Sequence, residues 1–136
     1  MSVTTEETLA QRNERIIHEF CDAWRRMDTA AIVDAFAPNI VYHNIPLAPL
    51  EGVEACRTFI TEFFKVAEGI EFHIHSLRAL DDLVVTERTD VFTLGGKEIA
   101  LPIAGFFDID ENGKISGWRD YFDLKSWYDQ GGPPLD

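Results

Sequence analysis

Residues 71–123 read EFHIHSLRALDDLVVTERTDVFTLGGKEIALPIAGFFDIDENGKISGWRDYFD. This stretch contains four segments with the composition and alternation of strands, at 71–80, 83–94, 98–108 and 114–123. The connections between them are rich in Asp, Asn and Gly and are short enough for hairpins. The pattern predicts four strands in an antiparallel meander.

The residues on either side of this stretch show helical spacing instead. Apolar residues recur every three to four positions over 5–27 and 52–67, as in amphipathic helices. Asp28 is placed to cap a short helix that Pro38 stops. The sequence therefore predicts an α+β fold, in which a strongly curved, mainly antiparallel β-sheet wraps around N-terminal helices as a cone with an apolar pocket inside. The expected elements outside the meander are helices over 5–27, 28–37, 52–67 and 124–130 and a strand over 40–44.

Length and charge restrict the class of protein. The 136 residues fit one domain over 1–136, and we expect residues 1–4 and 131–136 to be flexible ends. With 12 Lys and Arg against 24 Asp and Glu, the net charge of −12 opposes nucleic acid or a membrane as a partner. No run approaches the roughly 20 apolar residues of a membrane span, and the N-terminus has no apolar signal core. We expect a soluble, cytoplasmic protein in which Cys21 and Cys56 are buried, reduced thiols.

Polar side chains occur on otherwise apolar faces of three expected strands. At period-two spacing, Asp120 shares a strand face with aromatic residues, and Arg88 and Asp90 share a face with apolar ones. Tyr42 and Asn44 share a face just before a proline-bearing loop. Because burying a lone carboxylate is costly, these two acids and one arginine are predicted to meet and pair.

Such a group has a specific chemistry. Asp90 and Asp120 around Arg88 carry a formal charge of −1, and in a low-dielectric pocket the least costly correction is one proton shared by the acids. An ionised carboxylate beside a protonated one supplies a general base and a general acid. Tyr42 and Asn44 can hold a water against the base. The residues predict addition of water, and no nucleophile elbow or glycine-rich phosphate loop is present.

Each of these residues also has a purely structural interpretation. Arg88 and Asp90 could form an exposed cross-strand pair, and Asp120 could hold a neighbouring arginine or a backbone N–H. The apolar neighbours of Arg88 and Asp90 argue against exposure. His73 and His75 share a strand face, but no acid or further histidine follows at the spacing of a metal site. We expect no metal and no cofactor.

The pocket is predicted to take a small apolar ligand, because aromatic residues are frequent in the strands and in the C-terminal segment. The aromatic candidates for its wall are Phe92, Phe106, Phe107, Trp118, Phe122 and Trp127. The residues expected to contact the substrate are Trp24, Phe92, Leu101, Ile103, Phe122 and Trp127.

Three segments carry a resemblance to a known family. Residues 42–47 (YHNIPL), 86–91 (TERTDV) and 117–124 (GWRDYFDL) resemble, in the same order, the signature blocks of the limonene-1,2-epoxide hydrolase family. The likeness extends more loosely from residue 19 to about residue 127. It implies a cone of the nuclear-transport-factor-2-like (NTF2-like), SnoaL-like kind, usually a homodimer, which opens a small apolar or cyclic epoxide to a vicinal diol without metal, cofactor or covalent intermediate.

The resemblance also implies roles. Asp120 matches the base that deprotonates the attacking water, and Tyr42 and Asn44 match the groups that help hold it. Asp90 matches the acid that protonates the epoxide oxygen, and Arg88 matches the arginine that bridges the two carboxylates.

The sequence departs from the family pattern in the pocket, where Trp24, Phe92 and Trp127 are bulkier than the residues expected there. The cone fold also hosts SnoaL-like polyketide cyclases, ketosteroid isomerases and non-catalytic ligand-binding modules. A cyclase or isomerase would need an oxyanion donor but no water-holding pair, so Tyr42 and Asn44 favour hydrolysis.

Overall fold

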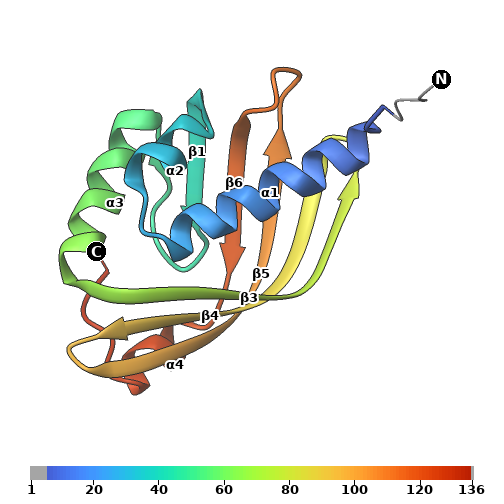
Figure 1. The fold of residues 1–136 in the computed structure, drawn as a ribbon. Coiled ribbons are helices and arrows are strands. Elements are labelled where there is room, and N and C mark those ends of the chain that lie inside the picture. The colour runs from blue at the N-terminus through green and yellow to red at the C-terminus, as the bar shows by residue number, and fades with distance from the viewer. Residues whose placement is uncertain (1–5, 136) are drawn as a thin grey trace.

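A curved six-stranded sheet with helices against its concave side makes up the structure, a computed structural model that describes residues 6–135 (Figure 1). The expected α+β cone is confirmed. The expected flexible end at residues 1–4 lies outside the described residues. The elements are α1 (Leu9–Arg25), α2 (Thr29–Asp34), β1 (Phe36–Asn44), β2 (Leu50–Glu51), α3 (Val53–Val66), β3 (Ala67–Leu80), β4 (Leu83–Leu94), β5 (Lys97–Ile109), β6 (Ile115–Tyr121) and α4 (Leu124–Asp129).

The strands lie in the order β2-β1-β6-β5-β4-β3. All neighbouring pairs are antiparallel except β1 and β6, which are parallel. The expected meander is confirmed as β3 to β6, and β4 has the predicted bounds of 83–94. The parallel pairing and the two-residue β2 were not expected, and both attach β1 to the end of the meander that carries β6.

The helices begin and end at residues that satisfy their free backbone groups. Thr8 caps α1 in a capping box with Gln11, so the helix begins at Leu9 rather than near residue 5. Asp28 caps α2 as expected, through a bond of 3.0 Å from the Ala31 amide. The expected extension of α2 to residue 37 is wrong, because the chain joins the sheet at β1 before it reaches Pro38.

The C-terminal residues contact the body of the protein. Trp127 Nε1 donates to the Pro133 carbonyl at 2.7 Å, and the Gly132 amide donates to the Trp127 carbonyl at 2.9 Å. The flexibility expected of residues 131–136 stays a prediction. Cys21 and Cys56 are free and buried, as predicted.

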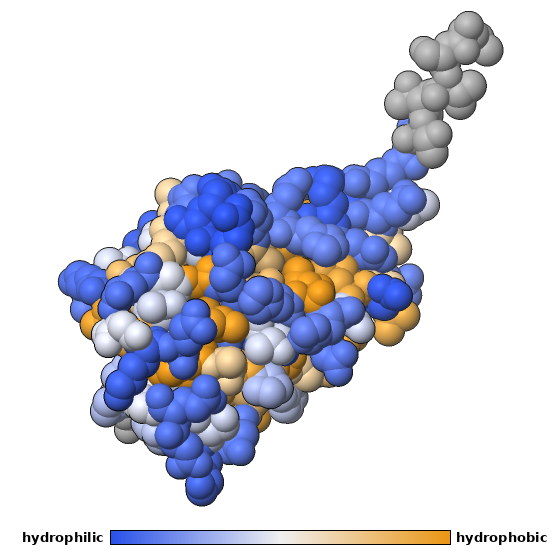
Figure 2. All heavy atoms as spheres, turned by 60° about the horizontal axis from the view of Figure 1, so that its bottom comes forward, coloured by the Kyte–Doolittle hydropathy of each residue, from blue (hydrophilic) through white to orange (hydrophobic). Residues whose placement is uncertain are grey.

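The surface alternates between polar and apolar regions. Figure 2, which turns the lower side of Figure 1 toward the viewer, shows hydrophobic residues gathered in the middle of this face and framed by hydrophilic ones. Across residues 6–135, every helix is too short or too polar to cross a bilayer.

Candidate active site

The site is built on one row of residues that crosses four strands. In the strand register Thr86 on β4 is opposite Gly105 on β5, and Gly105 is opposite Asp120 on β6. Asp120 is in turn opposite Asn44 on β1. Because side chains at paired positions point to the same face, the sheet directs this row toward its concave side.

Gly105 leaves the space through which Arg88 crosses β5. A Cβ at this position would collide with Arg88 Nη1 and lie 2.6 Å from Asp120 Oδ1 and 2.8 Å from Thr86 Oγ1. Arg88 itself is opposite Ile103, two residues away on β5, so its guanidinium extends diagonally over Gly105. The missing side chain therefore allows an arginine on β4 to bind an acid on β6.

Arg88, Asp90 and Asp120 form a buried ion cluster. Arg88 binds Asp90 with two hydrogen bonds, Nε to Oδ1 at 3.0 Å and Nη2 to Oδ2 at 2.9 Å. Nη2 also donates to Asp120 Oδ2 at 2.9 Å. The three side chains are 0%, 2% and 4% exposed, so water screens their charges little. With both acids ionised, the cluster carries a charge of −1.

Two residues that the sequence analysis did not assign to the catalytic group complete the cluster. Thr86 Oγ1 accepts a hydrogen bond of 2.9 Å from Arg88 Nη1 and donates to the Gly105 carbonyl at 3.2 Å. Trp118 Nε1 donates to Asp120 Oδ1 at 2.8 Å. Thr86 and Trp118 each precede a cluster residue by two positions on the same strand face, and that spacing is the signal that could have identified them.

Burial shifts the pKa values of two groups in the site. Removal of Asp90 from water raises the pKa of its carboxyl to about 6, with Arg88 opposing the rise and the charge of Asp120 adding to it. Burial and the charge of Asp120 raise the pKa of Tyr42 well above its ordinary value, so its phenol stays protonated. Asp90 is therefore a carboxyl that holds a proton more readily than usual, beside a second acid.

Tyr42 and Asn44 stand next to the acids. The Tyr42 ring stacks on Trp118 at a centroid distance of 4.1 Å, which places it on the Asp120 side of the sheet. The Ile45 amide donates to the Asp120 carbonyl at 2.9 Å and fixes the end of β1 beside β6. The structure thus brings together all five residues that the sequence analysis proposed as catalytic.

An apolar cavity of about 50 Å³, called here the inner cavity, adjoins three of these five residues, whereas Arg88 and Asp120 lie behind its wall. Asp90, Tyr42 and Asn44 are in its wall, as are all six residues expected to contact the substrate. Its remaining wall comes from Phe59, Phe63, Phe72 and Leu135.

Three of the aromatic candidates for the wall are placed elsewhere. Phe106 alternates onto the opposite face of β5, where it packs against Tyr121 at 5.6 Å. Phe107 and Trp118 are fully buried and pack on each other and on Phe20 under α1. The prediction that these three residues line the wall is therefore wrong. Phe106 is on the other side of the sheet, and Phe107 and Trp118 fill the core beside the inner cavity.

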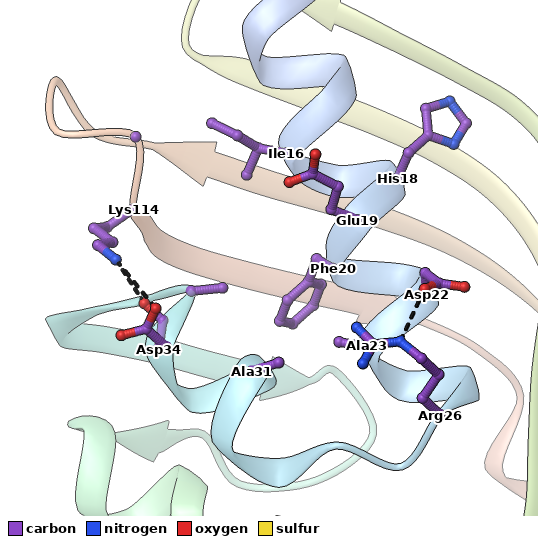
Figure 3. A pocket seen from close by; sticks show the side chains of 12 residues that line it. Ile16, His18, Glu19, Phe20, Asp22, Ala23, Arg26, Ala31, Asp34 and Lys114 are labelled. Carbon is purple, nitrogen blue, oxygen red and sulfur yellow. Dashed lines mark hydrogen bonds and ion pairs between the residues drawn. The ribbon is translucent and has the colours of Figure 1, made fainter.

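A larger surface groove lies between α1 and α2, away from the five candidate catalytic residues. It measures about 610 Å³ and is shared by apolar and charged side chains (Figure 3). Asp22 binds Arg26 at 2.9 Å along α1, and Lys114 Nζ lies 4.0 Å from the Asp34 carboxylate. None of the five candidate catalytic residues lines this groove.

The two histidines of β3 are on the exposed side of the sheet. His75 Nε2 lies 2.8 Å from Thr89 Oγ1, and His73 is also exposed. In the described part of the chain, the acidic, histidine and cysteine side chains form no group of three that could hold a metal ion.

Comparison with known proteins gives consistent matches. A sequence model of the family LEH, "Limonene-1,2-epoxide hydrolase catalytic domain", matches residues 11–131. The chain is 30% identical over 108 residues to epoxide hydrolase EphG of Mycobacterium tuberculosis, which covers 79% of this chain and 71% of that relative.

Solved structures show the same relationship. An LEH-like epoxide hydrolase of M. tuberculosis has a TM-score of 0.82 and 27% sequence identity, covering 90% of this chain and 91% of that chain. A candidate SnoaL-like polyketide cyclase of Shewanella denitrificans is alike in fold alone, with a TM-score of 0.80, 16% identity and coverage of 87% and 95%. These matches confirm the expected NTF2-like cone.

Proposed function

This chain belongs to the limonene-1,2-epoxide hydrolase family, and we propose that it adds water to an apolar epoxide to give a vicinal diol. The observation that carries the proposal is the single guanidinium of Arg88 bonded to two buried carboxylates, Asp90 and Asp120. Both M. tuberculosis relatives are described as epoxide hydrolases.

In the proposed reaction the two acids have opposite roles. Ionised Asp120 accepts a proton from a water held by Tyr42 and Asn44, and that water attacks one epoxide carbon. As the carbon–oxygen bond breaks, protonated Asp90 donates its proton to the departing oxygen. The product is a diol that contains both oxygens, and no covalent intermediate, metal or cofactor takes part.

Arg88 allows the starting protonation states of Asp90 and Asp120 to be restored after each turnover. After one turnover Asp120 has gained a proton from the water and Asp90 has given one to the product, so the total charge of the cluster is unchanged. The guanidinium contacts both carboxylates and stabilises whichever one is ionised. Return of the proton from Asp120 to Asp90 restores the starting state, directly or through bulk water.

The raised pKa of Asp90 supports this division of roles. Burial favours the protonated form of Asp90, which is the form a general acid needs. Asp120 accepts hydrogen bonds from Trp118 and Arg88, which hold its carboxylate in place. A cyclase or isomerase would use Asp120 to remove a proton from carbon, a role for which the Tyr42 and Asn44 pair is not required.

We also propose that the protein is a homodimer, as the family resemblance implies. Light scattering coupled to gel filtration would test this, and a mass of one chain across the working concentration range would contradict it.

The test of the activity is incubation with cyclohexene, styrene and limonene oxides and linear terminal epoxides, followed by chromatographic detection of diols. The expected result is diol formation that survives prolonged chelation. Absence of diol from every epoxide would contradict the proposal and favour a cyclase, an isomerase or a ligand-binding protein.

A further inference from the structure

The inner cavity is too small to hold a whole substrate. Its volume is about 50 Å³. Ligand pockets commonly measure about 300–1,000 Å³. The bulky side chains of Trp24, Phe92 and Trp127 are in its wall, and most of a substrate must lie elsewhere.

A second cavity, called here the outer chamber, adjoins the inner cavity and measures about 570 Å³. Tyr42, Asn44, Phe59 and Leu135 line both spaces. The proposed water-holding pair is therefore at the boundary between them. The rest of the outer chamber wall comes from the loop after β1, β2 and α4, with Pro46, Leu47, Ala48, Leu50, Leu124 and Tyr128.

Among the described residues 6–135, the side chains that line the outer chamber are uncharged. Although the chain has a net charge of −12, this part of the wall contains no Asp, Glu, Lys, Arg or His. Most of the lining side chains are aliphatic or aromatic, and they offer contact to a hydrocarbon rather than to an ion. Asn44 contributes a side-chain amide at the boundary with the inner cavity.

We propose that the outer chamber binds the hydrocarbon body of the substrate, while only the oxirane ring and the attacking water occupy the boundary at Tyr42 and Asn44. The substrate class is then an epoxide whose ring stands at the end of a long or bulky apolar body, in place of a compact cyclic epoxide. This inference rests on the proposed hydrolysis. It adds that the hydrocarbon body of the substrate provides most of the binding affinity.

Chain-length dependence tests the proposal. In a series of 1,2-epoxyalkanes from butane to decane, kcat/KM is expected to rise about fourfold for each added methylene that enters the outer chamber. A series that is flat or falls with length, with the short epoxides hydrolysed, would overturn the outer chamber as a substrate site and leave the proposed hydrolysis intact.

A binding measurement keeps the two proposals separable. Calorimetric titration with 1,2-butanediol and 1,2-decanediol, the corresponding products, does not depend on turnover. Tighter binding of the longer diol supports the outer chamber even if no epoxide is hydrolysed. Equal or undetectable binding of both diols overturns it.

A matched pair of variants tests whether the dependence of kcat/KM on chain length arises in the outer chamber. Ala48 is exposed and lines the outer chamber, so Ala48→Trp fills the space without disturbing the core. It is expected to lower the ratio of decane to butane epoxide kcat/KM about fifteenfold, the effect of roughly two methylenes. Ala30→Trp, on the exposed side of α2, is the control. An unchanged ratio in a folded Ala48→Trp protein would contradict the assignment.

Discussion

Gly105 and Arg88 are coupled by contact: the guanidinium of Arg88 occupies the place that a side chain on Gly105 would fill. The arginine thereby crosses β5 to bind Asp120 on β6, while it also binds Asp90 on its own strand, β4. The ion cluster depends on an absent side chain as much as on the charged ones. Substitution at Gly105 therefore tests the geometry of the site without removing any charge.

Gly105→Ala is expected to abolish diol formation, because its methyl group must displace Arg88 Nη1 or Asp120. Separation of a buried ion pair destabilises a protein by roughly 3–5 kcal/mol, so the melting temperature should also fall. Gly69→Ala is the matched control, since its Cβ would lie 3.6 Å from Thr93 Oγ1, an ordinary contact. Near-normal turnover in Gly105→Ala would contradict the proposed role of the cluster.

Asp120→Asn and Asp90→Asn should each reduce kcat about 100-fold to 10,000-fold, because each removes one half of the acid and base pair. Asp108→Asn is the control, since Asp108 pairs with Arg119 at 2.6 Å on the outer side of the same sheet. Its turnover should match that of the parent protein. An Asp90→Asn variant with normal kcat would remove Asp90 from the acid role.

Part of the fold could be predicted because its signals are local. Alternation and turn residues gave β4 its bounds, and a capping aspartate gave α2 its start. The parallel pairing of β1 with β6 has no such signal, because it joins Tyr42 to Trp118 across most of the chain. The ends of α1 and α2 differ from the predicted ones, because capping and the entry of the chain into the sheet compete with helical periodicity.

In the candidate site, too, residues with a local sequence signal could be predicted and those that depend on long-range pairing could not. Asp90, Arg88 and Asp120 could be found because a charge on an apolar strand face is visible in sequence. Gly105 could not, because its role depends on the register that places it between Thr86 and Asp120. The outer chamber was also invisible, since its wall combines the β1–β2 connection, two helices and the C-terminal segment.

Trp118→Phe should weaken both stability and turnover. It removes the N–H that binds Asp120 Oδ1 at 2.8 Å while keeping an aromatic ring under Tyr42. Loss of a buried hydrogen bond to a carboxylate costs about 1–3 kcal/mol, which chemical denaturation can measure. If kcat fell no further than it does in Phe106→Leu, a change on the outer sheet face, the bond would have no part in the reaction.

The pH dependence of turnover should report Asp90. Because its pKa is raised to about 6, the protonated form that donates to the epoxide is lost as pH increases through that value. At saturating substrate, kcat should therefore decrease above pH 6, by about tenfold per pH unit at the steepest. A kcat that stays constant between pH 5 and pH 8 would contradict proton donation by Asp90.

The same shift predicts a stability change with a defined sign. The folded-state pKa of Asp90 is raised above its ordinary value of 3.8, so the folded protein binds the proton more tightly than the unfolded chain. This contribution to stability is complete below pH 3.8 and is lost as pH rises through about 6. In Asp90→Asn the contribution is absent, so the difference in unfolding free energy between the two proteins should change with pH over this window.

Isotope labelling separates direct attack by water from covalent catalysis by an aspartate. If Asp120 only activates the water held by Tyr42 and Asn44, a single turnover with excess enzyme in oxygen-18 water must place the label in the first diol. In a covalent path the carboxylate oxygen would attack the epoxide carbon, and hydrolysis of the ester would release a first diol that carries an unlabelled enzyme oxygen. Mass spectrometry of the diol from that first turnover distinguishes the two outcomes. Unlabelled product would overturn the mechanism of general acid and base catalysis, although Asp120 would remain at the reacting carbon.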